Sequence, residues 1–242
     1  RNRLFDFHKK LRRLTFFDPA CGCGNFLVIS YRELRLLELD VLRAADALQG
    51  GGGQRSVDVH QLIGINVDQF FGIEIEEFPA QIAQVALWLV DHQMNLRVSE
   101  EFGQYFARIP LVTSPHIVHG NALTLDWNAV LPASQCSYVL GNPPFVGHQN
   151  RSSAQAADHD RIWGKDGRFG RLDFVTCWYR LAADYIRGTE SGPRVAFVST
   201  NSIAQGEQVG TLWGWLLAQG MRIQFAHRTF AWSNEARGKA AV

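Results

Sequence analysis

The chain has 242 residues, of which 46% are hydrophobic and 19% are charged, and its formal net charge is +1. This length and composition predict an ordered globular chain with a sizeable core, and they exclude a disordered or fibrous protein. The near-neutral charge also excludes a self-sufficient DNA-binding domain, because such domains are strongly basic. If nucleic acid is the substrate, another part of the protein must supply much of the binding.

The four cysteines show no Cys-x-x-Cys pair, and we therefore expect free thiols in a reducing cytoplasm and no structural zinc. There is no signal peptide and no apolar run of roughly 18 residues, so neither secretion nor membrane insertion is expected. The chain begins at Arg1 without a methionine and ends on residues 239–242, which resemble the start of a strand. We therefore expect a fragment of a longer protein.

Patterns typical of helices and strands alternate along the chain without internal repeats. This alternation predicts an α/β fold with a doubly wound, mostly parallel sheet and helices on both faces. A glycine-rich surface loop is expected at 49–54, and the polar stretch 150–171 has the most loop-like composition in the chain. Helices are expected over 1–13, 27–42, 80–94, 173–186 and 208–217, and strands over 14–17, 69–75, 117–119, 137–140, 194–199 and 223–227.

A short apolar run, 139–141, ends in the sequence Asn142-Pro143-Pro144-Phe145. The prolines end the expected strand, because they cannot donate to a sheet and their φ is fixed. The result is a rigid loop at the carboxyl end of a strand, where open α/β sheets bind ligands. The side-chain carbonyl of Asn142, the carbonyl of Pro143 and the aromatic ring suit a planar amino group. A simple Pro-Pro turn beside a chance asparagine is the alternative.

A second candidate ligand site is the stretch 18–26, which predicts a strand, a glycine-bearing turn and a helix. Glycines let the backbone approach a ligand closely, and the start of a helix offers free N–H groups. The pattern Gly-x-Gly lacks the third glycine of the dinucleotide fingerprint, and no Gly-Lys-Ser/Thr follows it. A tight turn with a purely structural role is the alternative.

Two polar residues follow the next expected strands. Glu74 is placed to accept hydrogen bonds from the ribose hydroxyls of an adenosine ligand, although it lies about 50 residues past the glycines instead of roughly 20. Asn121 is placed either to touch the adenine edge of that ligand or to stabilise a turn. Glu76 and Glu77 are expected to be solvated charges at a helix start. The histidines show no metal-ligand spacing.

Taken together, these motifs resemble the amino-group DNA methyltransferases that use S-adenosylmethionine. More narrowly, the chain resembles the gamma-type adenine-N6 branch found in single-chain restriction–modification and phage-defence enzymes. The resemblance covers nearly the whole chain. It rests on the stretches 18–26, 72–76, 120–123, 142–145, 172–175, 197–203 and 227–233.

The resemblance implies a class I, Rossmann-like methyltransferase whose glycine turn wraps the methionine part of the cofactor. Glu74, with Ile75 beside it, would hold the ribose, and Asn121 and Ala122 the adenine. Cys23 stands where serine is usual, and Asn121 where many relatives have aspartate, which would weaken a charge-assisted bond but keep an acceptor. The residues of the turn implied in cofactor binding are Asp18, Pro19, Ala20, Gly22, Gly24, Asn25 and Phe26.

The target adenine would be flipped out of double-stranded DNA into the Asn142–Phe145 loop, because such a base cannot be reached inside a duplex. Phe145 and Phe230 would stack on it, and Trp232 is the neighbour that could replace Phe230. Accepting both N6 hydrogens would localise the nitrogen lone pair for attack on the methyl group. No metal is implied. We expect one catalytic domain over 1–242, acting in the cytoplasm on the nucleoid, with its target-recognition domain on a missing part of the chain.

Three alternatives stay open at this point. A methyltransferase acting on RNA adenine or on a protein glutamine amide would use the same loop chemistry. A nicotinamide-dependent oxidoreductase would use a similar sheet, although the missing glycine and the Pro-Pro loop argue against it. A catalytically inactive fragment that only binds a ligand is the third.

Overall fold

A computed structural model describes residues 2–48, 63–103, 106, 114–165, 167–189 and 192–230. The chain divides into two compact units. The first, here called the sheet unit, contains Arg1–Gly141 and Gly188–Ala196. The second, here called the helical unit, contains Asn142–Arg187 and Phe197–Val242. Each unit is described by itself.

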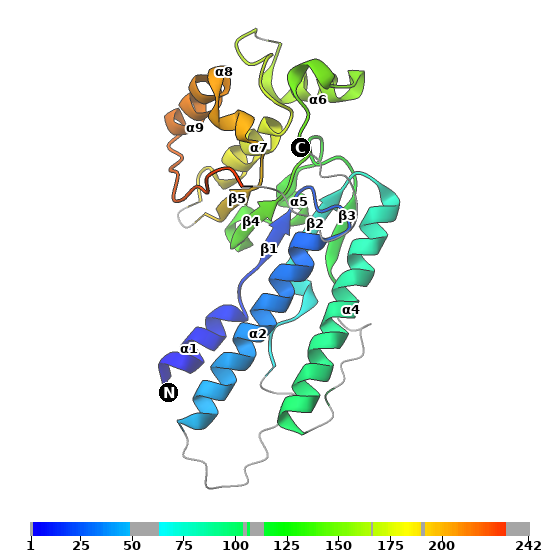
Figure 1. Cartoon of the computed structure of the whole chain (residues 1–242), viewed down its shortest axis with the longest axis vertical. Helices are drawn as coiled ribbons and strands as arrows, with labels where there is room; N and C mark the ends of the chain where they lie inside the picture. Colours follow the sequence, from blue (N-terminus) through cyan, green and yellow to red (C-terminus); the bar gives the residue numbers. More distant parts are fainter. Residues whose placement is uncertain are drawn as a thin grey trace. The chain divides into compact units, whose positions relative to one another are not determined.

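The sheet has five strands in the order β3-β2-β1-β4-β5 (Figure 1). The β1–β2, β2–β3 and β1–β4 pairs are all parallel. Because the strand order reverses between β1 and β4, the carboxyl ends of these two strands form the topological switch point at which such sheets bind ligands. The strands are β1 (Phe16–Asp18), β2 (Phe70–Glu74), β3 (His116–His119), β4 (Tyr138–Gly141) and β5 (Arg194–Phe197).

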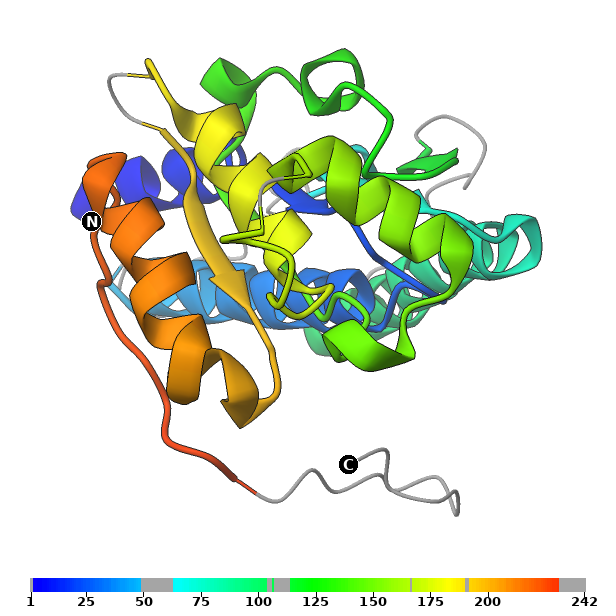
Figure 2. The same ribbon diagram turned by 90° about the horizontal axis from the view of Figure 1, so that it is seen from above.

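Helices cover both faces of this sheet. Two long helices, α2 (Asn25–Ala47) and α4 (Glu77–Phe102), lie side by side (Figures 1 and 2). Tyr31 of α2 packs edge-on against Phe70, which stacks on Phe16. The next residue of β1, Phe17, points to the opposite face and meets Trp127 of the short helix α5 (Trp127–Val130). The predicted parallel sheet with helices on both faces is therefore confirmed.

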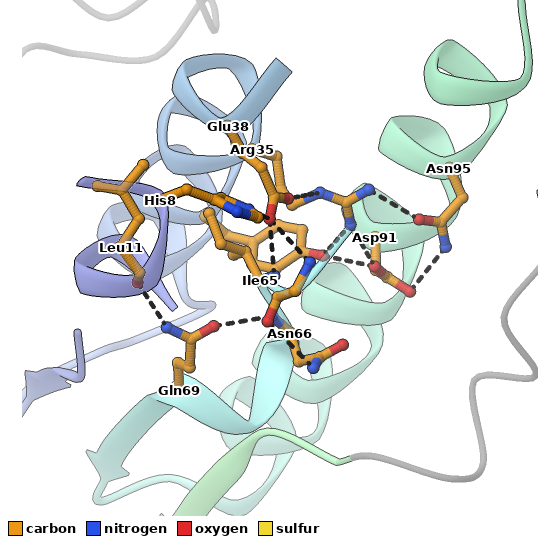
Figure 3. Close-up of polar contacts among 11 residues, drawn as sticks. His8, Leu11, Arg35, Glu38, Ile65, Asn66, Gln69, Asp91 and Asn95 are labelled. Carbon is orange, nitrogen blue, oxygen red and sulfur yellow. Dashed lines mark hydrogen bonds and ion pairs between the residues drawn. The ribbon is translucent and has the colours of Figure 1, made fainter. Parts of the chain in front are cut away.

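A buried carboxylate ties the first helix, α1 (Asn2–Leu11), to the rest of the sheet unit (Figure 3). Glu38 Oε1 lies 2.8 Å from His8 Nε2 and accepts hydrogen bonds from the backbone N–H groups of Gly64 at 2.8 Å and Ile65 at 3.2 Å. Glu38 is fully buried. A buried charge is tolerated only when it is hydrogen-bonded in this way, so these contacts fix the path of the chain into β2.

A buried arginine holds α2 to α4 in the same region (Figure 3). Arg35 Nη1 lies 3.0 Å from Asp91 Oδ1, and its Nη2 donates to Asn95 Oδ1 at 3.0 Å. Tyr31 donates to the same Asp91 oxygen. The two helices that begin beside the candidate ligand site are thus cross-linked by a buried polar network, in which Arg35 Nε and Glu38 Oε2 lie 3.5 Å apart and have no hydrogen-bond partner among the described residues.

The helical unit is formed from short helices. They are η3 (His148–Asn150), α6 (Ser153–Trp163), α7 (Thr176–Ile186), η4 (Asn201–Ala204), α8 (Gly206–Gln208), the π-helical turn η5 (Val209–Trp213) and α9 (Gly214–Ala218). The predicted helix over 208–217 is present within the continuous α8–η5–α9 segment, and α7 begins three residues later than predicted. The sheet unit has in addition the 3₁₀ turns η1 (Val67–Gln69) and η2 (Ala133–Gln135).

The predicted loop over 150–171 is wrong in its first half, which forms α6. The helix is started by a capping box: Ser152 Oγ accepts from the Gln155 N–H at 3.2 Å, and Gln155 Oε1 accepts from the Ser152 N–H at 2.9 Å. These reciprocal bonds satisfy two of the N–H groups that a helix start leaves unpaired. The polar composition of this stretch favoured a loop, although the Ser152 and Gln155 pair that starts the helix was present in the sequence.

The predicted strand over 223–227 is also wrong. Residues 221–230 have no regular secondary structure, and Ile223 and Phe225 are 58% and 70% exposed. Alternation of apolar residues forms a strand only where a neighbouring strand completes the hydrogen bonds, and in the described chain none pairs with this stretch. The expected features at 49–54, Trp232 and 239–242 lie outside the described residues. The described helices include none that is long and apolar enough to cross a membrane.

Candidate functional site

The glycine turn predicted between β1 and α2 lies at the switch point of the sheet. Asp18 ends β1, and its Oδ1 accepts a hydrogen bond from the Ala20 N–H at 3.0 Å. Gly22 and Gly24 have φ values of +54° and +83°, which favour glycine. A Cβ at Gly22 would meet nothing within 4 Å, whereas one at Gly24 would lie 3.0 Å from the Ala83 side chain. Gly22 therefore leaves open space, and Gly24 permits close packing on α4.

Glu74 fixes this turn from the next strand. Its Oε2 accepts from the Gly22 N–H at 2.8 Å, and its Oε1 accepts from the Glu76 N–H at 3.0 Å. The Glu74 backbone carbonyl accepts from the Gly120 N–H at 2.7 Å. One residue thus connects the ends of β2 and β3 to the glycine turn. A half-buried carboxylate oriented by two backbone donors is pre-organised for further hydrogen bonds.

Two carboxylates share this small region. Asp18 is 1% exposed, and burial, followed by repulsion from Glu74, raises the pKa of its carboxyl from 3.8 to about 7. The pKa of the Cys21 thiol is also raised, mainly by burial and then by the two acids. In the part of the chain that the structure describes, neither Asp18 nor Glu74 forms an ion pair. A ligand that carries positive charge would therefore interact more favourably with these two acids than a neutral or negative ligand would.

Asn121 has the turn role that the sequence left open. Its Oδ1 accepts from the Leu123 N–H at 2.9 Å. Ala122 is buried, and its carbonyl accepts from Trp127 Nε1 at 2.9 Å. The contact of Asn121 and Ala122 with an adenine ring stays a prediction.

Exposed apolar side chains follow the ends of β2 and β3. Ile75 is 57% exposed and Phe78, in the first turn of α4, is 72% exposed. Leu125, after β3, is 36% exposed. Single exposed apolar residues are ordinary, but Ile75 and Phe78 lie only one and four residues after Glu74, a polar ligand-type residue. Sequence analysis missed Phe78, although an aromatic between two acids and a proline was a usable signal.

In the helical unit, the Asn142–Phe145 loop presents an unsatisfied acceptor. Asn142 Oδ1 is shielded from solvent and has no hydrogen-bond partner among the described residues. Pro143 is buried, and Phe145 is 37% exposed. A buried carbonyl oxygen without a donor is unfavourable, so it points to a ligand that brings an N–H or O–H group.

The same loop is anchored by the stretch that follows α6. The Phe174 N–H donates to the Val146 carbonyl at 2.8 Å. The neighbouring Asp173 accepts from Ser202 Oγ at 2.5 Å and from Gln208 Nε2 at 3.3 Å. Asp173 therefore connects the loop region to η4 and α8. Sequence analysis noted this stretch as part of the resemblance and as the start of a helix over 173–186, and it gave Asp173 no role in the site.

The structure brings Asp18, Ala20, Gly22 and Glu74 together within the sheet unit, while Asn25 and Phe26 begin α2. A Cβ at Gly141, the last residue of β4, would lie 2.5 Å from Asp18 Oδ1, so β4 ends against this site. Asn142–Phe145 belong to the helical unit. Phe230 lies in the irregular stretch after α9 and is 61% exposed.

Comparison with known proteins gives a consistent result. The family described as "MmeI, DNA-methyltransferase domain" matches residues 1–242. A solved structure of the type IIL restriction–modification enzyme MmeI in complex with DNA is 62% identical, with a TM-score of 0.91 over 98% of this chain and 31% of that one. DNA methyltransferase A of Bacillus subtilis (strain 168) is 38% identical over 236 residues, which is 96% of this chain and 26% of that protein.

A shorter match covers 31% of this chain and 5% of the adenine-specific methyltransferase PglX of Streptomyces coelicolor (strain ATCC BAA-471 / A3(2) / M145), with 32% identity over 74 residues. The chain thus spans about a quarter to a third of the length of the two relatives that it matches almost throughout.

Proposed function

This chain belongs to the family of MmeI DNA-methyltransferase domains, and on that basis we propose that it transfers a methyl group from S-adenosylmethionine to the N6 amino group of adenine in DNA. We further propose that residues 1–242 form the catalytic domain of a restriction–modification or phage-defence enzyme that acts in the cytoplasm. In this proposal, a target-recognition domain elsewhere in the protein selects the site.

The single observation that carries this function is the state of Asn142. Its side-chain oxygen is buried and lacks a donor. A neutral amide oxygen in that state fits an amino group better than it fits a carboxylate or a phosphate, because only the amino group can donate to it. The name of the Streptomyces coelicolor relative, an adenine-specific methyltransferase, favours adenine as the base that bears this group.

The residues of the glycine turn fit S-adenosylmethionine. Gly22 leaves the backbone open on one side, Glu74 has an oriented carboxylate for ribose hydroxyls, and Ile75 and Phe78 offer apolar surface for an adenine ring. Asp18 and Glu74 lie close together without a cation among the described residues, and burial and Glu74 raise the pKa of Asp18, so a ligand with a sulfonium and an ammonium group would favour the ionised form of that carboxyl. S-adenosylmethionine, when bound, supplies an electrophilic methyl group on sulfur.

The chain's own residues would prepare the adenine for reaction. N6 is a poor nucleophile because its lone pair is delocalised into the ring. In our proposal, Asn142 Oδ1 and the Pro143 carbonyl accept the two N6 hydrogens, which favours a pyramidal nitrogen with a localised lone pair. Fixed acceptors that meet developing positive charge are electrostatic pre-organisation. The new N–C bond would form as the methyl–sulfur bond breaks and leaves its electron pair on sulfur, and the nitrogen would release one proton to solvent, so the product carries a single N6 hydrogen.

Phe145 would stack on the flipped base, and base–aromatic stacking is worth about 1–3 kcal/mol. Phe230, or Trp232 in its place, would cover the other face of the base in the same proposal. Stacking of this size offsets much of the unstacking that base flipping requires.

The test is transfer of labelled methyl from S-adenosylmethionine to unmethylated DNA by the full-length protein, followed by identification of the methylated nucleoside. We expect N6-methyladenine. Asn142→Ala should lower kcat about 10²–10³-fold, the loss typical of one pre-organised hydrogen-bonding group. Asn150→Ala, an exposed asparagine of η3, is the matched control and should leave kcat unchanged. Label in RNA or in protein glutamine instead of DNA would overturn the proposed substrate.

A further inference from the structure

A basic hollow lies at the edge of the sheet opposite the glycine turn. It has a volume of about 670 Å³ and is lined at the amino ends of three strands. Thr15 directly precedes β1, Ser137 directly precedes β4, and Arg194 begins β5. Asp18 and Gly141 end the same β1 and β4 strands. The hollow and the glycine turn are therefore separated by the length of the strands.

The walls of the hollow are held by hydrogen bonds between neighbouring strand starts. The Ser137 N–H donates to Thr15 Oγ1 at 2.9 Å, and Thr15 Oγ1 donates to the Gln135 carbonyl at 2.5 Å. The Arg194 N–H donates to the Ser137 carbonyl at 3.1 Å. All of these residues belong to the sheet unit. The shape of the hollow is thus set by the sheet itself.

The lining combines three cations with hydroxyl and amide groups. Lys10, Arg13 and Arg194 line the hollow, and among the described residues no acid lines it. All three are exposed, and within the described ranges none of them forms an ion pair. The stretch around α1 is basic in sequence as well, since residues 2–13 contain five Lys or Arg and a single acid, Asp6. This local excess of positive charge contrasts with the +1 of the whole chain.

Lys and Arg side chains together with Ser, Thr, Gln and Tyr side chains are the groups that contact phosphates in protein–DNA complexes. We propose that this hollow binds the phosphodiester backbone of a stretch of DNA other than the one that carries the methylated base. The proposal rests on the proposed function in that it takes DNA as the substrate. Phosphate contacts of this kind position a protein on DNA without reading the sequence.

The experiment measures binding of the full-length protein to a DNA fragment that it methylates, at several salt concentrations. Each phosphate contact contributes about 0.9 to the slope of log affinity against log salt. The triple variant Lys10→Gln, Arg13→Gln, Arg194→Gln should therefore lower the magnitude of the slope by about 2 to 3. The maximal methylation rate at saturating DNA should stay unchanged, because the hollow lies at the opposite edge from the glycine turn.

A matched control removes three exposed cations of the sheet unit that lie outside the hollow: Lys9→Gln, Arg32→Gln, Arg97→Gln. This control variant should change the salt slope by less than half of the change expected for the triple variant of the hollow. Equal salt slopes for the parent and the triple variant would overturn the proposal. This result is expected if an acidic segment of the same protein, instead of DNA, occupies the hollow. Absence of methyl transfer by the parent protein, with the slope still lowered in the triple variant, would instead overturn the proposed function alone.

Discussion

The Glu74 carboxylate shows how much one side chain organises at the candidate site. It receives backbone hydrogen bonds from both sides, at 2.8 Å from Gly22 and at 3.0 Å from Glu76. An ionised carboxylate can accept from two N–H donors and still has lone pairs for two hydroxyl groups. A carboxamide has one acceptor oxygen, and its NH₂ group would face one of the backbone donors.

We therefore predict that Glu74→Gln weakens binding of S-adenosylmethionine about 10- to 100-fold, which corresponds to roughly 1.5–3 kcal/mol for hydrogen bonds to a charged group. Isothermal titration calorimetry on the full-length protein measures this. Glu77→Gln is the control, since Glu77 is exposed and its carboxylate accepts from Gln81 in the next turn. Unchanged affinity in Glu74→Gln would show that this carboxylate does not hold the donor.

At the scale of elements, the loop that bears Asn142 depends on a stretch far along the chain. Asp173 accepts from Ser202 and Gln208, and the adjacent Phe174 N–H holds the Val146 carbonyl. Asp173 is thus a positioning residue for the loop. Small displacements of a reacting group reduce rates strongly, and about 1 Å can lower them 10²-fold.

We predict that Asp173→Ala lowers kcat about 10- to 100-fold and changes the affinity for S-adenosylmethionine less than twofold. Single-turnover methyl transfer and donor titration give the two values. Asp184→Ala is the control, because Asp184 pairs with Arg180 and Arg187 on the surface around α7. Loss of donor affinity in Asp173→Ala, parallel to the loss of rate, would contradict a role confined to the loop.

The α2–α4 pair gives a second prediction at this scale. Replacing Arg35 by Met leaves Asp91 and Glu38 buried without their cation, and breaking one partner of a buried pair costs about 3–5 kcal/mol. Arg32→Met, on the same helix, removes an exposed pair with Glu33 and should cost less than about 0.5 kcal/mol. Urea unfolding, monitored through the loss of S-adenosylmethionine binding, measures the free energies of unfolding of the two variants. Similar costs would mean that the network does not stabilise the helix pair.

Elements that depend on neighbouring residues in the chain were predictable from the sequence. The glycine turn, Glu74 at the end of β2 and the parallel sheet follow from local patterns of apolar residues, glycines and prolines. The start of α6 was missed although it depends on local residues, because Ser152 and Gln155 act through a reciprocal bond that composition does not reveal. The partners of Asp173 lie 29 and 35 residues away, so no local pattern encodes them. The strand predicted at 223–227 failed for the related reason that a strand needs a distant partner.

At the scale of the whole molecule, two buried groups with opposite behaviour contribute to the response of stability to pH. The pKa of Asp18 in the sheet unit is raised to about 7, chiefly by burial. The pKa of His159 in the helical unit is lowered to about 4, by burial and then by Arg151. His159 is fully buried, and neither ring nitrogen has a hydrogen-bond partner in the described chain.

The signs follow from proton binding. Between its unfolded pKa of 3.8 and about 7, Asp18 holds more protons in the folded state, so its contribution to stability falls as pH rises. Between about 4 and its unfolded 6.5, His159 holds fewer protons in the folded state, so its contribution rises with pH. Each effect is on the order of 3–5 kcal/mol, since one pKa unit corresponds to 1.36 kcal/mol. Over the shared window the two largely cancel.

We predict that replacing one of the two groups reveals how the other makes the free energy of unfolding depend on pH. In Asp18→Asn, which keeps an oxygen for the Ala20 N–H, the free energy of unfolding should rise from about pH 4 to 6.5. In His159→Leu it should fall from about pH 4 to 7, and the double variant should be nearly flat across the same window. Urea unfolding at a series of pH values measures all three. Where the two units unfold in separate transitions, each slope should appear in the transition of its own unit. A flat profile in His159→Leu would mean that Asp18 is ionised in the folded protein throughout this range, and a flat profile in Asp18→Asn would mean that His159 gains its proton as readily in the folded as in the unfolded protein.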